Sequence, residues 1–201
     1  EKRAQNSYSR DVLERLLANK PAMIGLIFLI VEAILVTVLP WLLPLDPIHS
    51  DPLAFQAAPS AAHWLGTDPI GRDLFSRLIY GGRVSLLVGV FSTLISLVIG
   101  VPLGLLAGYY RGVFESIVMR TADIFMSFPS IVLILVLVSV VGPSIWSVTL
   151  VIGILNWTSF ARLIYANTLS VMEMEYVESA RAIGSKDFTT ISRYILPNAF
   201  P

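Results

Sequence analysis

Four long apolar stretches restrict what this chain can fold into. About 20 consecutive apolar residues cross a bilayer as a helix, and each stretch is long enough to do so. Their side chains do not alternate in polarity, as the strands of a membrane barrel would. We therefore predict an all-α, polytopic transmembrane helical bundle with four spans, at residues 22–43, 84–110, 117–141 and 144–166.

Composition supports a membrane location and excludes several kinds of chemistry. Only 14% of the residues are charged, whereas soluble domains average about 25%. The formal net charge is zero, so no nucleic-acid partner is indicated. There is no cysteine, and the two histidines, His49 and His63, lie in a proline-rich stretch where we expect solvated loop residues. The sequence therefore predicts no catalytic group, no metal site and no cofactor in this chain.

The basic residues predict which ends of the spans face the cytoplasm. Loops on the cytoplasmic side of a membrane are enriched in lysine and arginine. Placing the N-terminus in the cytoplasm puts most of the 14 basic residues on that side. Residues 1–21 then form a cytoplasmic helix in the membrane interface, and residues 44–83 form an external loop whose end, 71–80, is a short amphipathic helix. Residues 84–201 form the core.

The second span carries a small residue at every fourth position, which places all of them on one helix face. Such a ridge lets a neighbouring helix approach closely, and we expect helix packing there, above all at its three glycines. Proline within the second and third spans is expected to kink each helix. The small-residue ridge consists of Ser92, Ser96, Gly100, Gly104 and Gly108, and the two prolines are Pro102 and Pro129.

Polar residues inside the spans leave alternatives open. Glu32 lies halfway along the first span, where it is either protonated, paired with another helix or, in a sharper hypothesis, part of a proton-coupled mechanism. Arg120 and Asp123 are three residues apart and are expected to form a local ion pair. A further group either lines a water-filled pathway or hydrogen-bonds between helices. These candidate pathway residues are Ser127, Asn156, Trp157 and Ser159.

The stretch after the fourth span is more than a simple turn. Residues 174–183 are good helix formers, and Gly184 follows as a residue that tolerates positive φ. Ser185 is expected to cap a second short helix over 186–195, and Pro197 marks the next break. Two short helices around a glycine form a rigid knob, defined as residues 170–197. It either docks into a soluble partner or is a solvated loop.

The knob resembles the EAA loop of binding-protein-dependent ABC importers. That pattern is E-A-A, three residues, G, nine residues, then I-x-L-P, and it is matched here from Glu178 to Gly184 and again at 194–197. Ser179 and Tyr194 depart from the pattern, whereas the Glu–Gly–Leu–Pro spacing holds. Upstream, three stretches are similar to the C-type permeases for dipeptides, oligopeptides and nickel, at residues 63–77, 81–86 and 104–110.

The resemblance implies a type I ABC importer permease, multi-pass in the cytoplasmic (inner) membrane of a prokaryote and surrounded by lipid. It implies a heterodimer with a second, homologous permease subunit. It also implies two cytoplasmic ATPase subunits that bind ATP and Mg²⁺, and an extracytoplasmic substrate-binding protein. The residues that the resemblance assigns to ATPase coupling are Glu178, Ala180, Arg181, Gly184 and Ser185.

Two further points agree with that assignment. The sequence contains no phosphate-binding loop of the G-x-x-x-x-G-K-[ST] type, so we expect ATP hydrolysis in a partner and no enzyme activity in this chain. Six spans are expected in the full family member, and this sequence stops at Pro201, where a fifth would begin. We therefore expect a fragment.

The predicted function is that of a permease subunit for di- or oligopeptides. A nickel or other small-solute importer of the same family is the alternative. An ion-coupled secondary transporter would need ionisable groups deep in several spans, and Glu32 alone meets that requirement. The knob and the kinked spans disfavour a mere membrane anchor. A membrane enzyme is the weakest alternative, because no constellation of nucleophile, base or metal ligand stands out.

Overall fold

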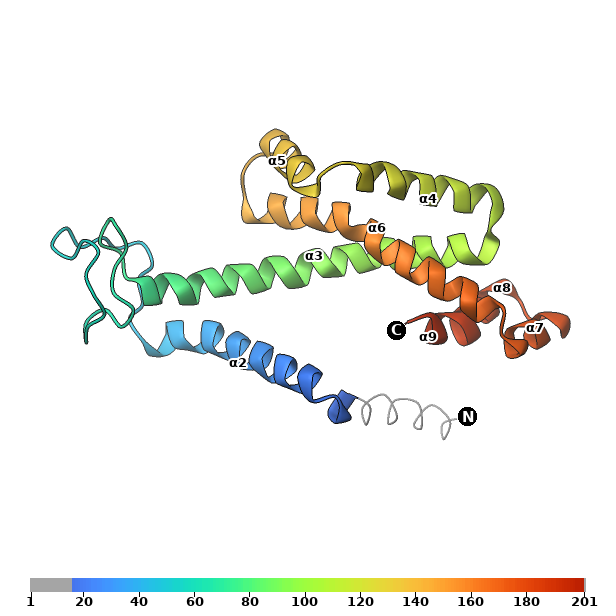
Figure 1. The fold of residues 1–201 in the computed structure, drawn as a ribbon, viewed down its shortest axis with the longest axis horizontal. Coiled ribbons are helices and arrows are strands. Elements are labelled where there is room, and N and C mark those ends of the chain that lie inside the picture. The colour runs from blue at the N-terminus through green and yellow to red at the C-terminus, as the bar shows by residue number, and fades with distance from the viewer. Residues whose placement is uncertain (1–15, 201) are drawn as a thin grey trace. The chain divides into compact units, whose positions relative to one another are not determined.

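The structure, a computed structural model, describes residues 16–200, which are mainly helical (Figure 1). The chain divides into two compact units, residues 1–86 and 87–201. The interfacial helix predicted for residues 1–21 falls largely outside the described part. The helices are α2 (Lys20–Leu42), α3 (Leu74–Tyr110), α4 (Gly112–Ser127), α5 (Ser130–Val141), α6 (Ile145–Met172), α7 (Glu175–Ala182), α8 (Asp187–Thr189), a π-helical turn (Thr190–Ile195) and α9 (Leu196–Ala199).

Three helices of the described chain, α2, α3 and α6, are long and apolar enough to cross a membrane. α4 and α5 together pass the same test but are bent by 90° at the break between them, which allows up to four spans. The predicted all-α, multi-span fold is confirmed. The separate short helix predicted for residues 71–80 is wrong, because α3 begins at Leu74 and runs to Tyr110 without interruption, even at Pro102.

α2 begins where a polar cap and a proline fix its first turn. The side chain of Asn19 accepts a hydrogen bond from Ala22 N at 3.2 Å, and Pro21 occupies an early position that needs no N–H partner. Beyond this turn most of its apolar side chains are exposed. That surface suits contact with lipid, because the helix pairs its backbone polar groups internally.

Glu32 lies on the side of α2 that faces the first turns of α3. It is half-buried, and a Cβ atom added at Gly82 would stand 3.8 Å from its Oε1 and 2.9 Å from Cγ1 of buried Val36. The glycine thus leaves room for both side chains. Ionisable groups inside spans generally face protein rather than lipid, and Glu32 follows that rule.

The small-residue ridge of α3 lies against α6. A Cβ atom added at Gly104 would stand 3.0 Å from Ala161 Cα, and one added at Gly108 would stand 2.8 Å from Thr168 Cβ. Gly100 is closed in by the same helix. Side chains do not fit at these distances, so the two backbones approach only because these positions have none.

The third apolar run is two helices rather than the single kinked helix predicted for 117–141. Pro129 breaks the run, because proline has no backbone N–H and moves the residue before it out of the helical conformation. Phe128 accordingly has φ −98° and ψ 143°, and a new helix starts after the proline. α4 begins earlier than expected, at Gly112, and both Gly112 and the preceding Arg111 have positive φ.

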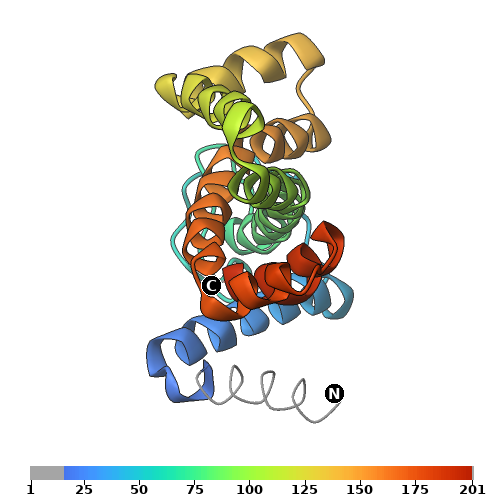
Figure 2. The same ribbon diagram turned by 90° about the vertical axis from the view of Figure 1, so that its right-hand side faces the viewer.

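Two buried apolar clusters hold α3, α4, α6 and the knob together. α4 and α5 lie along one side of α6, and α7–α9 gather at its C-terminal end (Figures 1 and 2). The first cluster joins α3, α4 and α6 through Ala107, Val118, Ala122, Trp157 and Ala161. The second joins the C-terminal ends of α3 and α6 to the knob and α9 through Leu105, Tyr109, Ile164, Val171, Val177, Ile195 and Ala199.

Candidate functional site

The knob turns sharply at Gly184, just after α7. Gly184 has a φ of +80°, and its N–H donates to Arg181 O at 2.9 Å. The N–H of Ser185 donates to Ala180 O at 3.0 Å. This pair of hydrogen bonds is a Schellman ending, which satisfies carbonyl groups that the last helical turn would otherwise leave free. The predicted positive φ at Gly184 is confirmed.

The second half of the knob differs from the helix predicted for residues 186–195. α8 is only three residues long, and the π-helical turn follows it directly. The predicted cap at Ser185 is wrong, because Lys186 is the N-cap residue and its side chain makes no capping hydrogen bond. The Ser185 hydroxyl instead accepts a hydrogen bond from the Thr190 hydroxyl at 3.2 Å. Ser185 therefore links the turn to the π-helical segment.

The chain also stays helical at Pro197, where a break was predicted. Proline lacks the N–H that an ordinary helical turn needs. Here the π-helical turn comes just before it, and Leu196 N donates five residues back to Ile191 O. Pro197 then occupies the first turn of α9, where its missing N–H is tolerated. The widened turn is what accommodates the proline.

The knob has a buried face and an exposed face. Val177 and Ile195 are completely buried in the cluster that joins the knob to α3 and α6. On the exposed face, Ile183 is 85% exposed and Phe188 is 81% exposed. These two exposed apolar side chains lie on either side of the Gly184 turn.

The residues that the resemblance assigns to ATPase coupling differ in their exposure to solvent. Glu178 and Arg181 are exposed, whereas Ala180 is only 4% exposed and packs inward. The two most exposed apolar side chains of the knob, Ile183 and Phe188, are not among the predicted coupling residues. A large apolar residue on either side of a glycine turn, in a segment outside the spans, was the sequence signal that could have found them.

Polar contacts tie the knob to the end of α3. The Tyr109 hydroxyl donates to Asp187 Oδ1 at 2.7 Å, and the Tyr110 hydroxyl lies 3.5 Å from Asp187 Oδ2. The guanidinium carbon of Arg181 lies 4.7 Å from the centre of the Tyr109 ring. A cation at that distance is attracted by the face of the ring. Arg181 therefore contacts α3 of its own chain.

Two of the four candidate pathway residues come together at the break between α4 and α5. Asn156 and Ser159 line a cavity of about 210 Å³ there, with residues from both helices. Trp157 belongs to the buried cluster of α3, α4 and α6, and the Ser127 hydroxyl donates to a carbonyl of its own helix. Irregular backbone inside a span is tolerated where it is buried in protein or lines a water-filled cavity. The cavity provides such a surrounding for the break.

The ion pair predicted between Arg120 and Asp123 is wrong. Asp123 pairs instead with Arg162, which α6 brings alongside α4. The hydroxyl of Tyr165, also on α6, donates to Glu115 of α4. Both side chains of the ion pair are well exposed, so the pair adds little stability in itself. Together the two contacts fix the register of α4 on α6.

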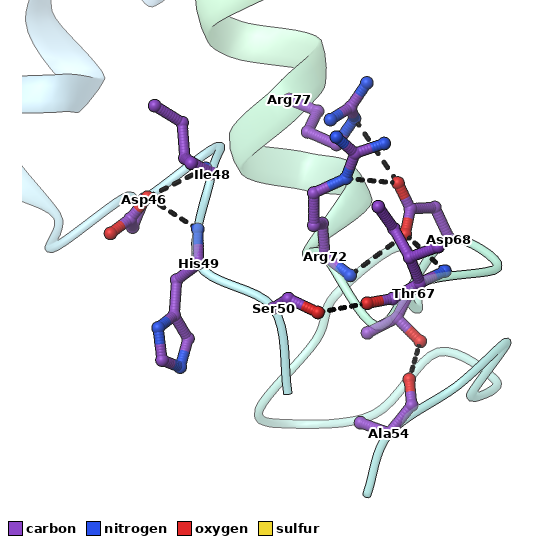
Figure 3. A network of polar contacts seen from close by, with 10 residues as sticks. Asp46, Ile48, His49, Ser50, Ala54, Thr67, Asp68, Arg72 and Arg77 are labelled. Carbon is purple, nitrogen blue, oxygen red and sulfur yellow. Dashed lines mark hydrogen bonds and ion pairs between the residues drawn. The ribbon is translucent and has the colours of Figure 1, made fainter. Parts of the chain in front are cut away.

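The loop before α3 is held by hydrogen bonds rather than by regular secondary structure (Figure 3). Asp68 accepts hydrogen bonds from the N–H groups of Ile70 and Arg72, each at 3.0 Å, and from Arg72 Nε at 2.7 Å. The Ser50 hydroxyl donates to Ile70 O from the other arm of the loop. These contacts join the two arms just before α3 begins.

The same contacts set the charge of the loop carboxylates. Burial alone would raise the pKa of Asp68, but hydrogen bonds from the backbone and side chain of Arg72 lower it to about 2. Burial likewise acts to raise the pKa of Asp73, and hydrogen bonds from Ser76 and His63 outweigh it and lower the pKa. Both carboxylates are therefore charged at neutral pH.

Taken together, these features define a class of protein. It is a multi-span α-helical membrane protein with a compact, ordered knob attached to the ends of two helices. No group of three or more metal-ligating side chains occurs in residues 16–200.

Comparison with known proteins then identifies the family. Residues 100–201 match the model of the binding-protein-dependent transport system inner membrane component, and the chain belongs to this family. Residues 7–59 match the N-terminal transmembrane domain of oligopeptide transport permease C. The predicted resemblance to a C-type importer permease is confirmed.

Several similar curated proteins are named as peptide permeases. The glutathione transport system permease protein GsiD of Pectobacterium atrosepticum is 45% identical over 141 residues, which cover 70% of this chain and 47% of that protein. The dipeptide transport system permease protein DppC of Bacillus subtilis is 36% identical over 197 residues, which cover 98% of this chain and 62% of the relative. DppC of Alkalihalophilus pseudofirmus is 37% identical, with 94% and 62% covered. The chain thus spans 47–62% of the length of these relatives.

Proposed function

We propose that this chain is the C-type permease subunit of an ATP-binding-cassette importer that moves di- or oligopeptides across the cytoplasmic membrane. The observation that carries the proposal is the knob, which is anchored on α3 and α6 and exposes Ile183 and Phe188. Membership in the binding-protein-dependent transport family supports it. The relatives named as dipeptide and glutathione permeases favour peptides over the alternative, nickel or another small solute.

In the proposed complex the knob docks on a separate ATPase subunit, and two such subunits serve the transporter. Ile183 and Phe188 insert into apolar recesses of the ATPase, as buried anchors do at protein interfaces. Glu178, exposed on α7, makes polar contacts at the rim. ATP and Mg²⁺ are bound by the ATPase, since this sequence has no phosphate-binding loop motif. Movement of the knob reaches the spans through its packing on α3 and α6.

A second, homologous permease completes the proposed pathway, and a binding protein delivers the substrate from outside. In this chain the pathway includes the cavity at the break between α4 and α5. The side-chain amide of Asn156 and the hydroxyl of Ser159 hydrogen-bond passing peptide groups. Phe125 and Phe128 line the same cavity and offer apolar contact to peptide side chains.

The experiment that tests docking is Gly184→Val in the assembled transporter. A β-branched residue at φ +80° is strained by about 1–3 kcal/mol, although open space surrounds the position. We expect the variant to insert in the membrane but to lose uptake, and the ATPase activity to stop responding to loaded binding protein. Uptake of labelled dipeptide and ATP hydrolysis in proteoliposomes measure both effects.

Gly142→Val is the matched control. Gly142 has φ +103° and open space around it, but it lies in the turn between α5 and α6, away from the knob. This variant carries a comparable strain and should keep the response to loaded binding protein. Wild-type uptake in Gly184→Val with the ATPase still bound would refute the docking proposal.

A further inference from the structure

Tyr109 joins the end of α3 to the knob through a hydrogen bond. It lies in the last turn of α3, is only 7% exposed, and directs its hydroxyl to a side chain 78 residues further along the chain, Asp187. Apolar packing already joins the knob to α3 and α6. The contact between Tyr109 and Asp187 is therefore a polar link in addition to this apolar packing.

The two halves of the knob meet on this one side chain. Arg181 belongs to α7, before the Gly184 turn, and its guanidinium group lies over the Tyr109 ring. Asp187 belongs to α8, after the turn, and accepts the hydrogen bond from the Tyr109 hydroxyl. A displacement of either half relative to α3 therefore changes a contact of Tyr109.

The polar contact also differs in kind from the apolar cluster around it. Apolar burial is non-directional, so the packing around a side chain such as Val177 does not depend on the alignment of individual bonds. A hydrogen bond to a carboxylate is short, directional and stronger than one between neutral groups. The bond from Tyr109 to Asp187 thus fixes the position of the knob against α3 in a way that packing alone does not.

α3 is in turn joined rigidly to the rest of the unit. The ridge glycine Gly104 and the hydroxyl of Ser96 both contact α6, the latter through a hydrogen bond to Gly153 O at 2.9 Å. A force applied at the end of α3 is therefore carried by two closely packed helices.

We propose that Tyr109, held between Asp187 and Arg181, is the positioning residue that transmits knob movement to α3. The proposal rests on the proposed function of the knob as the ATPase-docking element. It also gives Arg181 a role within this chain rather than at the ATPase surface.

The test is Tyr109→Phe in the complete transporter, which removes the hydroxyl and keeps the ring beneath Arg181. The ratio of ATPase activity with and without loaded binding protein is measured in proteoliposomes. We expect this ratio to fall about tenfold toward one, the effect of losing a hydrogen bond to a charged group. The matched control is Tyr110→Phe, which should keep the ratio, because the Tyr110 hydroxyl lies 3.5 Å from the same carboxylate, too far for a strong hydrogen bond.

A second measurement separates transmission from docking. Ala182→Cys, at an exposed position of α7, carries a photoactivatable cross-linker to the ATPase, and the chain has no other cysteine. We expect the double variant Ala182→Cys, Tyr109→Phe to cross-link as well as Ala182→Cys alone does. A retained ratio with an intact cross-link overturns the transmission role. A cross-link lost in Tyr109→Phe overturns it too, because the hydroxyl would then only hold the knob in place. Failure to cross-link in Ala182→Cys with Tyr109 unchanged contradicts the docking proposal itself.

A double-mutant cycle tests whether Tyr109 and Asp187 act through the same contact. Asp187→Asn should reduce the ratio as Tyr109→Phe does, and the double variant should be no worse than either single variant, because both remove the same contact. Additive losses would show that the two residues act separately and would overturn the proposal.

Discussion

At the scale of single residues, Asp68 organises the loop before α3. Besides its bonds to Ile70 and Arg72, its Oδ2 lies 3.7 Å from Arg77 Nε in the first turn of α3. Its pKa of about 2 lies below the ordinary value of about 3.9. A carboxyl group with a lowered pKa stabilises the fold fully above the ordinary value and progressively less as the pH falls toward the lowered one. The contribution of Asp68 is therefore lost between about pH 4 and pH 2.

We predict that Asp68→Asn loosens this loop at neutral pH. The amide keeps the shape of the side chain but loses the charge that strengthens its hydrogen bonds. Hydrogen–deuterium exchange of peptides from residues 44–73 should be faster than in the unmutated protein. That difference between the two proteins should shrink as the pH approaches 2. The control for removing a carboxylate from the same loop is Asp51→Asn, since the Asp51 side chain accepts a hydrogen bond from the Leu53 N–H. Equal exchange in Asp68→Asn and the unmutated protein at pH 7 would contradict the assignment.

Residue-scale features could be predicted only where the cause is local in sequence. The positive φ at Gly184 follows from a helix that must end in a turn, and the sequence shows both the helix and the glycine. The partner of Asp123 does not follow, because Arg162 reaches it from another helix while Arg120 is merely near in sequence. The hydrogen bond between Tyr109 and Asp187 could not be predicted for the same reason, because the two residues are far apart in sequence.

At the scale of helices, we predict that Gly104→Leu disrupts the contact between α3 and α6. A leucine side chain has no space beside Ala161, and overpacking of this kind costs about 1–3 kcal/mol even where the neighbours adjust. The yield of assembled complex and its melting temperature in detergent should both fall.

Gly89→Leu gives the matched comparison on the same helix. A Cβ atom at Gly89 meets nothing within 4 Å, and leucine favours a helix by about 1 kcal/mol relative to glycine. This variant should assemble normally. A normal yield of Gly104→Leu as well would show that the ridge contact is dispensable for assembly.

Helix positions follow from hydropathy, because membrane spans need long apolar runs, and α2, α3 and α6 overlap three of the four predicted stretches. Their ends follow less closely, since α3 begins at Leu74 rather than at 84 and α6 ends at Met172 rather than at 166. The size of a proline's effect does not follow. Pro102 lies within an uninterrupted α3, and Pro129 separates α4 from α5 by a 90° bend. Pro197 lies in the first turn of α9, directly after a π-helical turn. The sequence rules for proline do not distinguish these three outcomes.

At the scale of the whole molecule, the break between α4 and α5 decides the topology. If the pair is one broken span, three crossings separate the external loop from the knob, and the two lie on opposite sides of the membrane. If the pair is a re-entrant loop, only α3 and α6 cross between them, and both lie on the same side. The distribution of basic residues favours the first arrangement.

We therefore predict that single cysteines in the loop and in the knob are labelled from opposite sides. Leu53→Cys and Phe188→Cys suit the measurement, because their positions are 96% and 81% exposed and the chain has no cysteine of its own. In intact cells or oriented vesicles, a membrane-impermeant maleimide should label Leu53→Cys without permeabilisation and Phe188→Cys only after it. Labelling of both positions from outside would make α4 and α5 a re-entrant loop. It would also place the knob on the side of the membrane that holds no ATP, where it has no ATPase to contact.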